Sequence, residues 1–287
     1  METTKLLTLP DKRQLAYAEF GKPSGHPVLY FHGGLSCRLE PLLWGDETIK
    51  RSGLYLIAPD RPGIGRSDPQ PNRSFSDYVK DVEFLAGALG WNKFSTLGVS
   101  GGGGYGVACA AKIPNRLHTV VMASGAWQAD AIKHFPIAQR LAWRLAQRFP
   151  LINLLTLKLE LQSLNDSAER RLAKMKKRVS PVDYDFVESQ NRVETVRQMS
   201  AESMCQGLKG VAWDTQLYLK EWDFNVDKIQ MPLTFLHGEQ DITIPIAVAK
   251  QVAASLPTAQ LTTYPAEGHL TLIANQFETI ASKLIVK

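Results

Sequence analysis

One glycine-rich stretch, residues 94–106, constrains the fold more than any other part of the chain. It begins as a short apolar run that is typical of a buried strand and ends in a series of glycines, FSTLGVSGGGGYG. Its centre, Gly98-Val99-Ser100-Gly101-Gly102, has the spacing of a nucleophile elbow, in which a serine occupies a sharp strand-to-helix turn. Glycines are expected two residues before and after that serine, because the strand and the helix pass too closely for side chains there.

A second pattern overlaps the first and suggests a different use of the same glycines. Gly101, Gly103 and Gly106 fit the G-x-G-x-x-G fingerprint of dinucleotide-binding folds. That fingerprint usually opens the first βαβ unit of its domain, whereas several expected strands come first here. The expected second strand, which closes at residues 122–124, also lacks an acidic residue at its end. The nucleophile turn is therefore the better interpretation, and a plain glycine turn with an ordinary serine is the other alternative.

Short apolar segments alternate with helical patterns through residues 1–126. This alternation predicts a doubly wound α/β fold with a mostly parallel sheet, in which sites form at the carboxyl ends of the strands. Besides the strand before Ser100, we expect strands at residues 5–9, 14–20, 27–31, 54–58 and 117–123, and helices at residues 40–51, 76–89 and 105–113, the second of them capped by Ser76.

The pattern changes between residues 127 and 222, where strand signals give way to helical periodicity. Within residues 136–149, apolar residues recur every four positions, and a matching basic stripe lies on another face. The apolar row is Ile137, Leu141, Leu145 and Phe149, and the basic row is Arg140, Arg144 and Arg148. We expect an all-helical insertion over 127–222 whose arginines lie on a solvated outer face, between core segments 1–126 and 223–287.

The second core segment returns to alternating strands and helices. Strands are expected at residues 232–236 and 260–264, and helices at residues 246–256 and 270–284. A serine needs an adjacent base to become a nucleophile, and an imidazole base needs a carboxylate to fix its tautomer. Asp241 and His269 meet this requirement, since each follows one of these strands and the order Ser, Asp, His is the one expected after an elbow.

Asp241 and the other acidic and histidine residues also allow other interpretations. Asp241 could instead cap the segment that follows it, and Asp130 is an alternative acid. His237 lies at a strand end beside a glycine, so we expect a structural, hydrogen-bonded role for it. Histidines, cysteines and carboxylates nowhere show the spacing of metal ligands, and we therefore expect no metal.

Acyl transfer also requires N–H donors for the oxyanion. The elbow supplies the amide of Gly101, and a second donor should come from a loop after an earlier strand. The loop His32-Gly33-Gly34 fits this place, and Gly34 is the expected donor. Candidate substrate-binding positions are Gly33, Trp127 and Trp213, and Trp143 and Trp222 are further candidates for the pocket wall. Aromatic residues in helices more often belong to the core.

Composition disfavours several classes of function. The net charge is +5, without a run of like charges long enough for a nucleic-acid arm. The three cysteines are far apart and form no disulfide framework, which is typical of a reducing compartment. The N-terminal residues show no secretory signal, and no apolar run approaches the ~20 residues of a membrane span. We expect a cytoplasmic monomer or homodimer that binds a small-molecule ester and no nucleic acid, and the composition disfavours membrane association.

Taken together, the motifs resemble those of α/β-hydrolase fold serine hydrolases with a helical cap. The resemblance implies an eight-stranded, mostly parallel sheet, a Ser100–Asp241–His269 triad and a pocket roofed by residues 127–222, with no cofactor for ester hydrolysis. The matching segments are His32-Gly33-Gly34, residues 60–67 (DRPGIGRS), Gly98-Val99-Ser100-Gly101-Gly102, His237-Gly238-Glu239-Gln240-Asp241 and Gly268-His269.

Several motif residues differ from those of related families, and these differences disfavour some reaction classes. Haloalkane dehalogenases and epoxide hydrolases use Asp where this chain has Ser100. Prolyl aminopeptidases continue His-Gly-Gly with Pro-Gly and usually place Trp after the serine, whereas this chain has Leu35-Ser36 and Gly101. The leading hypothesis is hydrolysis of a small, largely apolar carboxylic ester. The alternatives are hydrolysis of a carbon–carbon bond by the same triad and a slow-turnover ligand-binding or signalling protein. A third is a membrane-surface role, which the arginine stripe and the basic segment 170–178 suggest.

Overall fold

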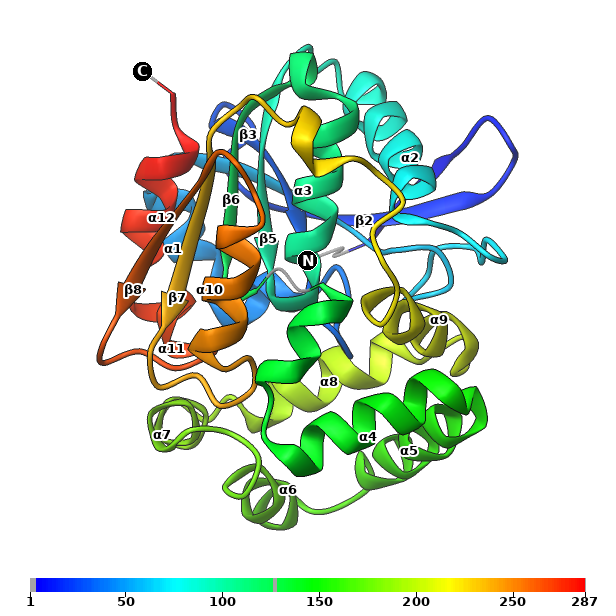
Figure 1. Ribbon diagram of the computed structural model, residues 1–287. Helices are drawn as coiled ribbons and strands as arrows, with labels where there is room; N and C mark the ends of the chain where they lie inside the picture. The colour runs from blue at the N-terminus through cyan, green and yellow to red at the C-terminus, as the bar shows by residue number, and fades with distance from the viewer. Residues whose placement is uncertain (1–3, 126–127, 287) are drawn as a thin grey trace.

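The computed structural model describes residues 4–125 and 128–286, and its centre is a twisted eight-stranded sheet with helices on both faces (Figure 1). The order across the sheet is β1-β2-β4-β3-β5-β6-β7-β8. Only the pairings of β1 with β2 and of β2 with β4 are antiparallel, which confirms the expected doubly wound, mostly parallel sheet. The strands are β1 Lys5–Thr8, β2 Gln14–Gly21, β3 His26–Phe31, β4 Leu54–Pro59, β5 Phe94–Val99, β6 Leu117–Ala123, β7 Leu233–Gly238 and β8 Ala259–Tyr264.

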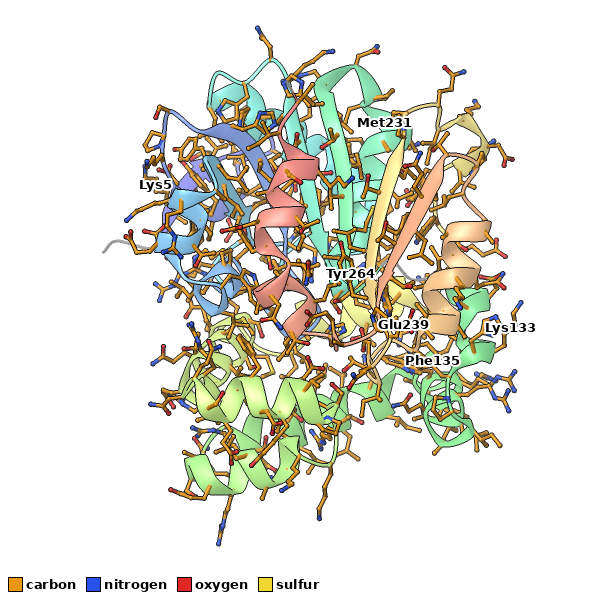
Figure 2. All side chains as sticks on the ribbon, turned by 90° about the vertical axis from the view of Figure 1, so that its left-hand side faces the viewer. Lys5, Lys133, Phe135, Met231, Glu239 and Tyr264 are labelled. Carbon is orange, nitrogen blue, oxygen red and sulfur yellow. The ribbon has the colours of Figure 1, made fainter. Side chains whose placement is uncertain are left out.

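The central strands are apolar because the sheet separates two hydrophobic cores. In β5 every residue is buried, with Phe94 in one core and Leu97 and Val99 in the other. One core lies under α2 (Phe75–Ala88), α3 (Gly103–Lys112) and α10 (Ile246–Ala254). The opposite face is covered by α1 (Asp46–Arg51) and α12 (Phe277–Leu284), and α12 stands in front of the sheet in Figure 2.

Three helical boundaries differ from the sequence-based expectation. The helix expected over 40–51 is a 3-10 turn, η1 (Glu40–Leu43), followed by α1, because Gly45 between them has a φ of +86°. The helix expected over 270–284 is divided into α11 (Thr271–Asn275) and α12. The cap of α2 is Ser74 rather than Ser76, since the Ser74 hydroxyl accepts the amide of Asp77 in a capping box.

Helices and loops make up the described residues between β6 and β7, and no strand occurs among them. They lie across the edge at which the parallel strands end, so they cover the loops that follow β3, β5, β7 and β8 (Figure 1). The division at residues 127 and 222 stays a prediction. The helices are η4 Ala129–His134, α4 Ile137–Arg148, α5 Pro150–Ser163, α6 Ala168–Met175, α7 Pro181–Ser189, α8 Val193–Ser203 and α9 Lys209–Tyr218.

Candidate active site

Ser100 stands at the end of β5, where a single 3-10 turn, Ser100–Gly102, leads directly into α3. Its φ of +52° is a left-handed conformation that non-glycine residues seldom adopt. A Cβ at Gly98 would lie 2.7 Å from the carbonyl oxygen of Gly102, and a Cβ at Gly102 would overlap the carbonyl oxygen of Phe31. Close backbone packing therefore requires both glycines, as the sequence pattern predicted.

Gly101, the residue after the serine, faces Tyr218 at the end of α9. A Cβ at Gly101 would overlap the hydroxyl of Tyr218, which donates a 2.7 Å hydrogen bond to Asp214. The Tyr218 side chain thus leaves no room for a side chain at position 101. The unusual glycine is explained by this contact, which no sequence pattern around residue 101 could show.

His269 and Asp241 lie in the loops that follow β8 and β7. Figure 2 shows Tyr264 at the end of β8 beside Glu239, which follows β7, and the Glu239 amide donates to the Tyr264 carbonyl at 3.0 Å. This pairing brings the two loops together, and His269 Nδ1 lies 2.7 Å from Asp241 Oδ2. Because a carboxylate only accepts hydrogen bonds, Nδ1 carries the proton and Nε2 is left as the basic nitrogen.

The Asp241 carboxylate is fixed on both of its oxygens. Its Oδ1 accepts the amides of Thr243 and Ile244 at 2.8 Å each, and its side chain is fully buried. Asp241 therefore caps the following turn and holds His269 at the same time. His237 has the structural role expected of it, since its Nε2 lies 2.9 Å from the Ile244 carbonyl. The alternative acid, Asp130 in η4, accepts a hydrogen bond at its Oδ2 from Nε2 of Gln251 at 3.4 Å.

The loop between β8 and α11, residues 265–270, carries His269 and is called the histidine loop below. A buried carboxylate that sequence analysis did not single out holds this loop from the other side. Asp183, on α7, accepts the amides of His269 at 2.8 Å, Leu270 at 2.7 Å and Thr271 at 3.0 Å. Its side chain also accepts the Ser180 hydroxyl at 2.7 Å. The three amides belong to the start of α11, where backbone donors have no partner within the helix. In the sequence, the only signal at Asp183 is the helix start Ser180-Pro181-Val182-Asp183. That signal does not show that the carboxylate contacts the loop that carries His269.

The charges around His269 favour its protonated form. Burial of the ring by itself lowers the pKa, but the Asp241 carboxylate, through its charge and its hydrogen bond, and the more distant Asp183 raise the pKa of His269 above its ordinary value. A base with a raised pKa takes a proton from a hydroxyl more readily than an unperturbed imidazole does.

The loop after β3 lies beside Ser100, as a Cβ at Gly33 would be 3.3 Å from the Ser100 Cβ. The guanidinium of Arg61 donates to the carbonyls of His32 at 2.5 Å and Gly33 at 2.8 Å. On its other side, the Gly33 amide donates to Glu40 Oε2 at 2.9 Å. The loop that carries Gly34 is therefore held in place by two buried charged side chains.

Arg61 is itself held by a buried acidic residue, Asp214 on α9. The Asp214 carboxylate pairs with Arg61 at 2.7 Å and with Arg73 at 2.5 Å, and it accepts the hydroxyl of Tyr105 at 2.6 Å. Burial opposes the charge of Asp214, but the two guanidinium groups hold its pKa well below the ordinary value. Arg61 thus links the loop after β3 to a helix of the segment between β6 and β7.

Ser100, His269 and the glycines of both loops line one cavity of about 680 Å³. Gly33, Gly34 and Gly101 stand on its wall together with the serine and the histidine. Most of the remaining wall is apolar and comes from η1, α4, α5, α8 and the histidine loop. Its residues include Leu43, Trp44, Ala142, Trp143, Leu145, Ala146, Ile152, Leu157, Met199 and Leu270.

The candidate substrate-binding tryptophans have different positions. Trp143 lines the cavity. The indole N–H of Trp213 donates to the Arg73 carbonyl at 2.8 Å, and its ring lies 4.6 Å from the ammonium of Lys220. Trp127 lies outside the described residues. Within the described ranges, no group of three or more His, Cys, Asp and Glu side chains could hold a metal ion.

A family model described as alpha/beta hydrolase fold matches residues 26–276. This chain belongs to the alpha/beta hydrolase family. The solved structure of a thermophilic esterase from Thermogutta terrifontis is 22% identical, with a TM-score of 0.66 over 97% of this chain and 95% of that chain. At this identity the likeness shows the fold alone.

Two curated relatives of this α/β-hydrolase show different extents of similarity. A proline iminopeptidase from Xylella fastidiosa (strain 9a5c) is 31% identical over 122 residues, 41% of this chain and 38% of that protein. A poly(3-hydroxyalkanoate) depolymerase from Ectopseudomonas oleovorans is 26% identical over 88% of this chain and 81% of its own length. The match spans only 38% to 39% of the length of the first curated relatives. Their activities are therefore not assigned to this chain.

Proposed function

We propose that this α/β-hydrolase cleaves a small, largely apolar carboxylic ester through an acyl-enzyme. The observation that carries the proposal is the 2.7 Å contact between His269 Nδ1 and Asp241 Oδ2 at a cavity that Ser100 also lines. The contact leaves Nε2 of His269 free of the proton, as a general base must be.

The reaction follows from the roles of these groups. Ser100 Oγ attacks the ester carbonyl carbon as His269 takes the hydroxyl proton, and the amides of Gly34 and Gly101 bind the oxyanion. His269 then donates the proton to the leaving alcohol, and an acyl-enzyme forms on Ser100. Water attacks this intermediate with His269 again as base, which releases the carboxylic acid and returns the proton to Ser100.

The walls of the cavity support the choice of an apolar ester. Side chains from α4 and α5 contribute leucine, alanine, isoleucine and tryptophan surfaces, which favour an acyl or alcohol group without charge. The depolymerase relative is named for a polyester substrate, which also favours ester chemistry. The Tyr218 side chain beside Gly101 and the residues Leu35-Ser36 depart from the aminopeptidase pattern and disfavour peptide cleavage.

A panel of p-nitrophenyl esters of graded acyl length tests the proposal. We expect turnover by the wild type and a loss of about 10⁴-fold or more for Ser100→Ala and for His269→Ala. Ser282→Ala, an exposed serine on α12 whose hydroxyl donates to the Thr279 carbonyl, is the matched control and should keep full activity. Equal rates for wild type and Ser100→Ala would show that the serine is not the nucleophile, and a burst followed by near-zero turnover would indicate a ligand-binding protein.

A further inference from the structure

Helices α4 and α5, between β6 and β7, are neighbours (Figure 1). Both expose rows of large apolar side chains. Both rows recur every four residues, so each follows one face of its helix. Exposed fractions of these side chains lie between 47% and 77%, whereas an apolar row on a helix normally packs inward. The row on α4 with its connection to α5 is Ile137, Leu141, Leu145 and Phe149, and the row on α5 is Leu151, Leu155 and Leu159.

Arginines run beside the apolar row of α4. Arg140, Arg144 and Arg148 each follow a residue of that row by three positions, which places them about 60° around the helix from it. Within the described ranges, none of the three forms an ion pair with a carboxylate. Glu160, the one acidic residue of α4 and α5, is paired with Arg178 at 3.0 Å. The positive charge beside the apolar rows is therefore uncompensated.

The exposed apolar surface continues into the cavity that holds Ser100. Leu145 on α4 and Ile152 on α5 are 47% and 40% exposed, and both also line the cavity wall. An apolar molecule on the outer surface of the two helices would thus meet apolar side chains along the way to Ser100. Clusters of exposed apolar residues of this kind are uncommon on surfaces that face only water.

We propose that the exposed apolar rows of α4 and α5, with the three arginines beside the row of α4, bind the surface of an anionic lipid bilayer. The leucines enter the acyl boundary, and the arginines extend their guanidinium groups to the lipid phosphates. Among the described residues, none of the helices could span a bilayer. In the proposed orientation, α4 and α5 lie in the plane of the interface. Binding itself is independent of catalysis, while the delivery of lipid-borne esters to Ser100 rests on the proposed function.

Charge favours a lipid surface over a second copy of the chain. A two-fold dimer through these apolar rows would place the same patch on both sides and bring two sets of arginines together without acidic partners. The sequence alone places the arginines on a solvated face and disfavours membrane association. The exposure of the apolar row beside them is the structural observation that changes this assessment.

Sedimentation with phosphatidylcholine vesicles, prepared with and without phosphatidylglycerol as the anionic lipid, tests the proposal. We expect the wild type to sediment with the anionic vesicles and to be released as salt rises. The variant Leu141→Glu/Leu155→Glu should bind at least about tenfold more weakly, because two charges would enter the acyl boundary. Leu6→Glu, at a leucine of β1 that is 61% exposed, is the matched control and should bind like the wild type.

The charge contribution has its own pair of variants. Arg140→Glu/Arg144→Glu/Arg148→Glu should lose anionic binding, whereas Lys22→Glu/Lys93→Glu/Lys112→Glu changes the net charge equally at exposed sites on the core and should retain more of it. Thermal unfolding establishes that each variant folds. Absence of wild-type sedimentation, or equal binding by the Leu141/Leu155 variant, would overturn the proposal. So would a wild-type dimer in light scattering that the same variant converts to a monomer without any vesicle binding.

Discussion

The carboxylate of Asp183 accepts the backbone amide of His269 at 2.8 Å, across a separation of 86 residues in the chain. Asp183 belongs to α7, between β6 and β7, whereas His269 follows β8 in the core. The same carboxylate binds the next two amides, so the position of the proposed base depends on a helix outside the sheet. We interpret Asp183 as a positioning residue that acts through His269.

Asp183→Asn tests this positioning role. The substitution keeps the size of the side chain but removes its charge and turns an NH₂ group toward backbone donors. We expect a loss of about 1–3 kcal/mol in the free energy of unfolding. We also expect a lower kcat and a shift of the acid limb of kcat/KM to lower pH, because Asp183 helps to raise the pKa of His269. Asp185→Asn, exposed on the same helix, is the control, and an unshifted acid limb in Asp183→Asn would limit Asp183 to a structural role.

The pH dependence of wild-type activity follows from the state of His269. Only the neutral imidazole can act as the base, and the pKa of His269 is raised by Asp241 and Asp183 despite the effect of burial. Activity should therefore rise with pH through a midpoint above the ordinary histidine value of about 6.5. A pH profile of kcat/KM with a neutral ester measures this midpoint, and a midpoint below the ordinary value would contradict the assignment.

The raised pKa of His269 also affects the stability of the fold. Its contribution to stability falls with rising pH, whereas activity rises. His269 binds its proton more tightly in the folded protein than in the unfolded chain, so this linkage stabilises the fold at pH values below the unfolded pKa. The contribution is lost as pH rises through the folded pKa. His269→Gln should remove this part of the pH dependence of unfolding, which urea titrations at several pH values would reveal.

Gly101→Ala tests the contact between the elbow and α9. The new methyl group would overlap the Tyr218 hydroxyl and displace it from Asp214. We expect a destabilisation of about 1–3 kcal/mol, because the site is overpacked. Gly87→Ala in α2 is the matched control, since a Cβ there meets nothing within 4 Å, and it should stabilise the helix by roughly 0.5–1 kcal/mol. Equal stabilities for the two variants would show that Tyr218 moves aside freely.

Asp214→Ala tests the buried charge cluster beneath the loop after β3. Removal of this carboxylate leaves the guanidinium groups of Arg61 and Arg73 buried without their acidic partner. We expect a loss of about 3–5 kcal/mol in the free energy of unfolding, measured by urea denaturation. Asp227→Ala, at an exposed site in η5, should change the stability by no more than about 0.5 kcal/mol. A small effect in both would show that the cluster contributes little.

Local sequence patterns were sufficient for the sheet and for the elbow, because their causes are local. The buried part of β6, residues 120–123, is apolar at every position because both faces of the strand are covered. The turn at Ser100 needs glycines at 98 and 102 to avoid backbone overlap. Asp241 and His269 could be predicted because chemistry required one acid and one base in loops after later strands. Nothing in that reasoning depended on how distant helices pack.

Contacts between distant segments could not be predicted in this way. The bond from His269 to Asp183 arises because α7 packs on α11, which no pattern within either segment encodes. The collision that fixes Gly101 depends likewise on Tyr218 from α9. Periodicity places Leu141 on one face of α4, but it does not say whether another element covers that face. These features depend on tertiary packing, and they are the ones that the structure added.

Labelling with a fluorophosphonate probe, followed by mapping of the modified peptide, tests most directly whether Ser100 is an activated nucleophile. The probe phosphonylates a serine only where a base and an oxyanion site act on its hydroxyl. We predict stoichiometric modification of Ser100 in the wild type, in Ser282→Ala and in the variants designed to weaken vesicle binding. We predict loss of the modification in Ser100→Ala and His269→Ala. No label on a folded wild type would contradict the proposed mechanism. Equal labelling of the wild type and of Ser100→Ala would contradict it as well.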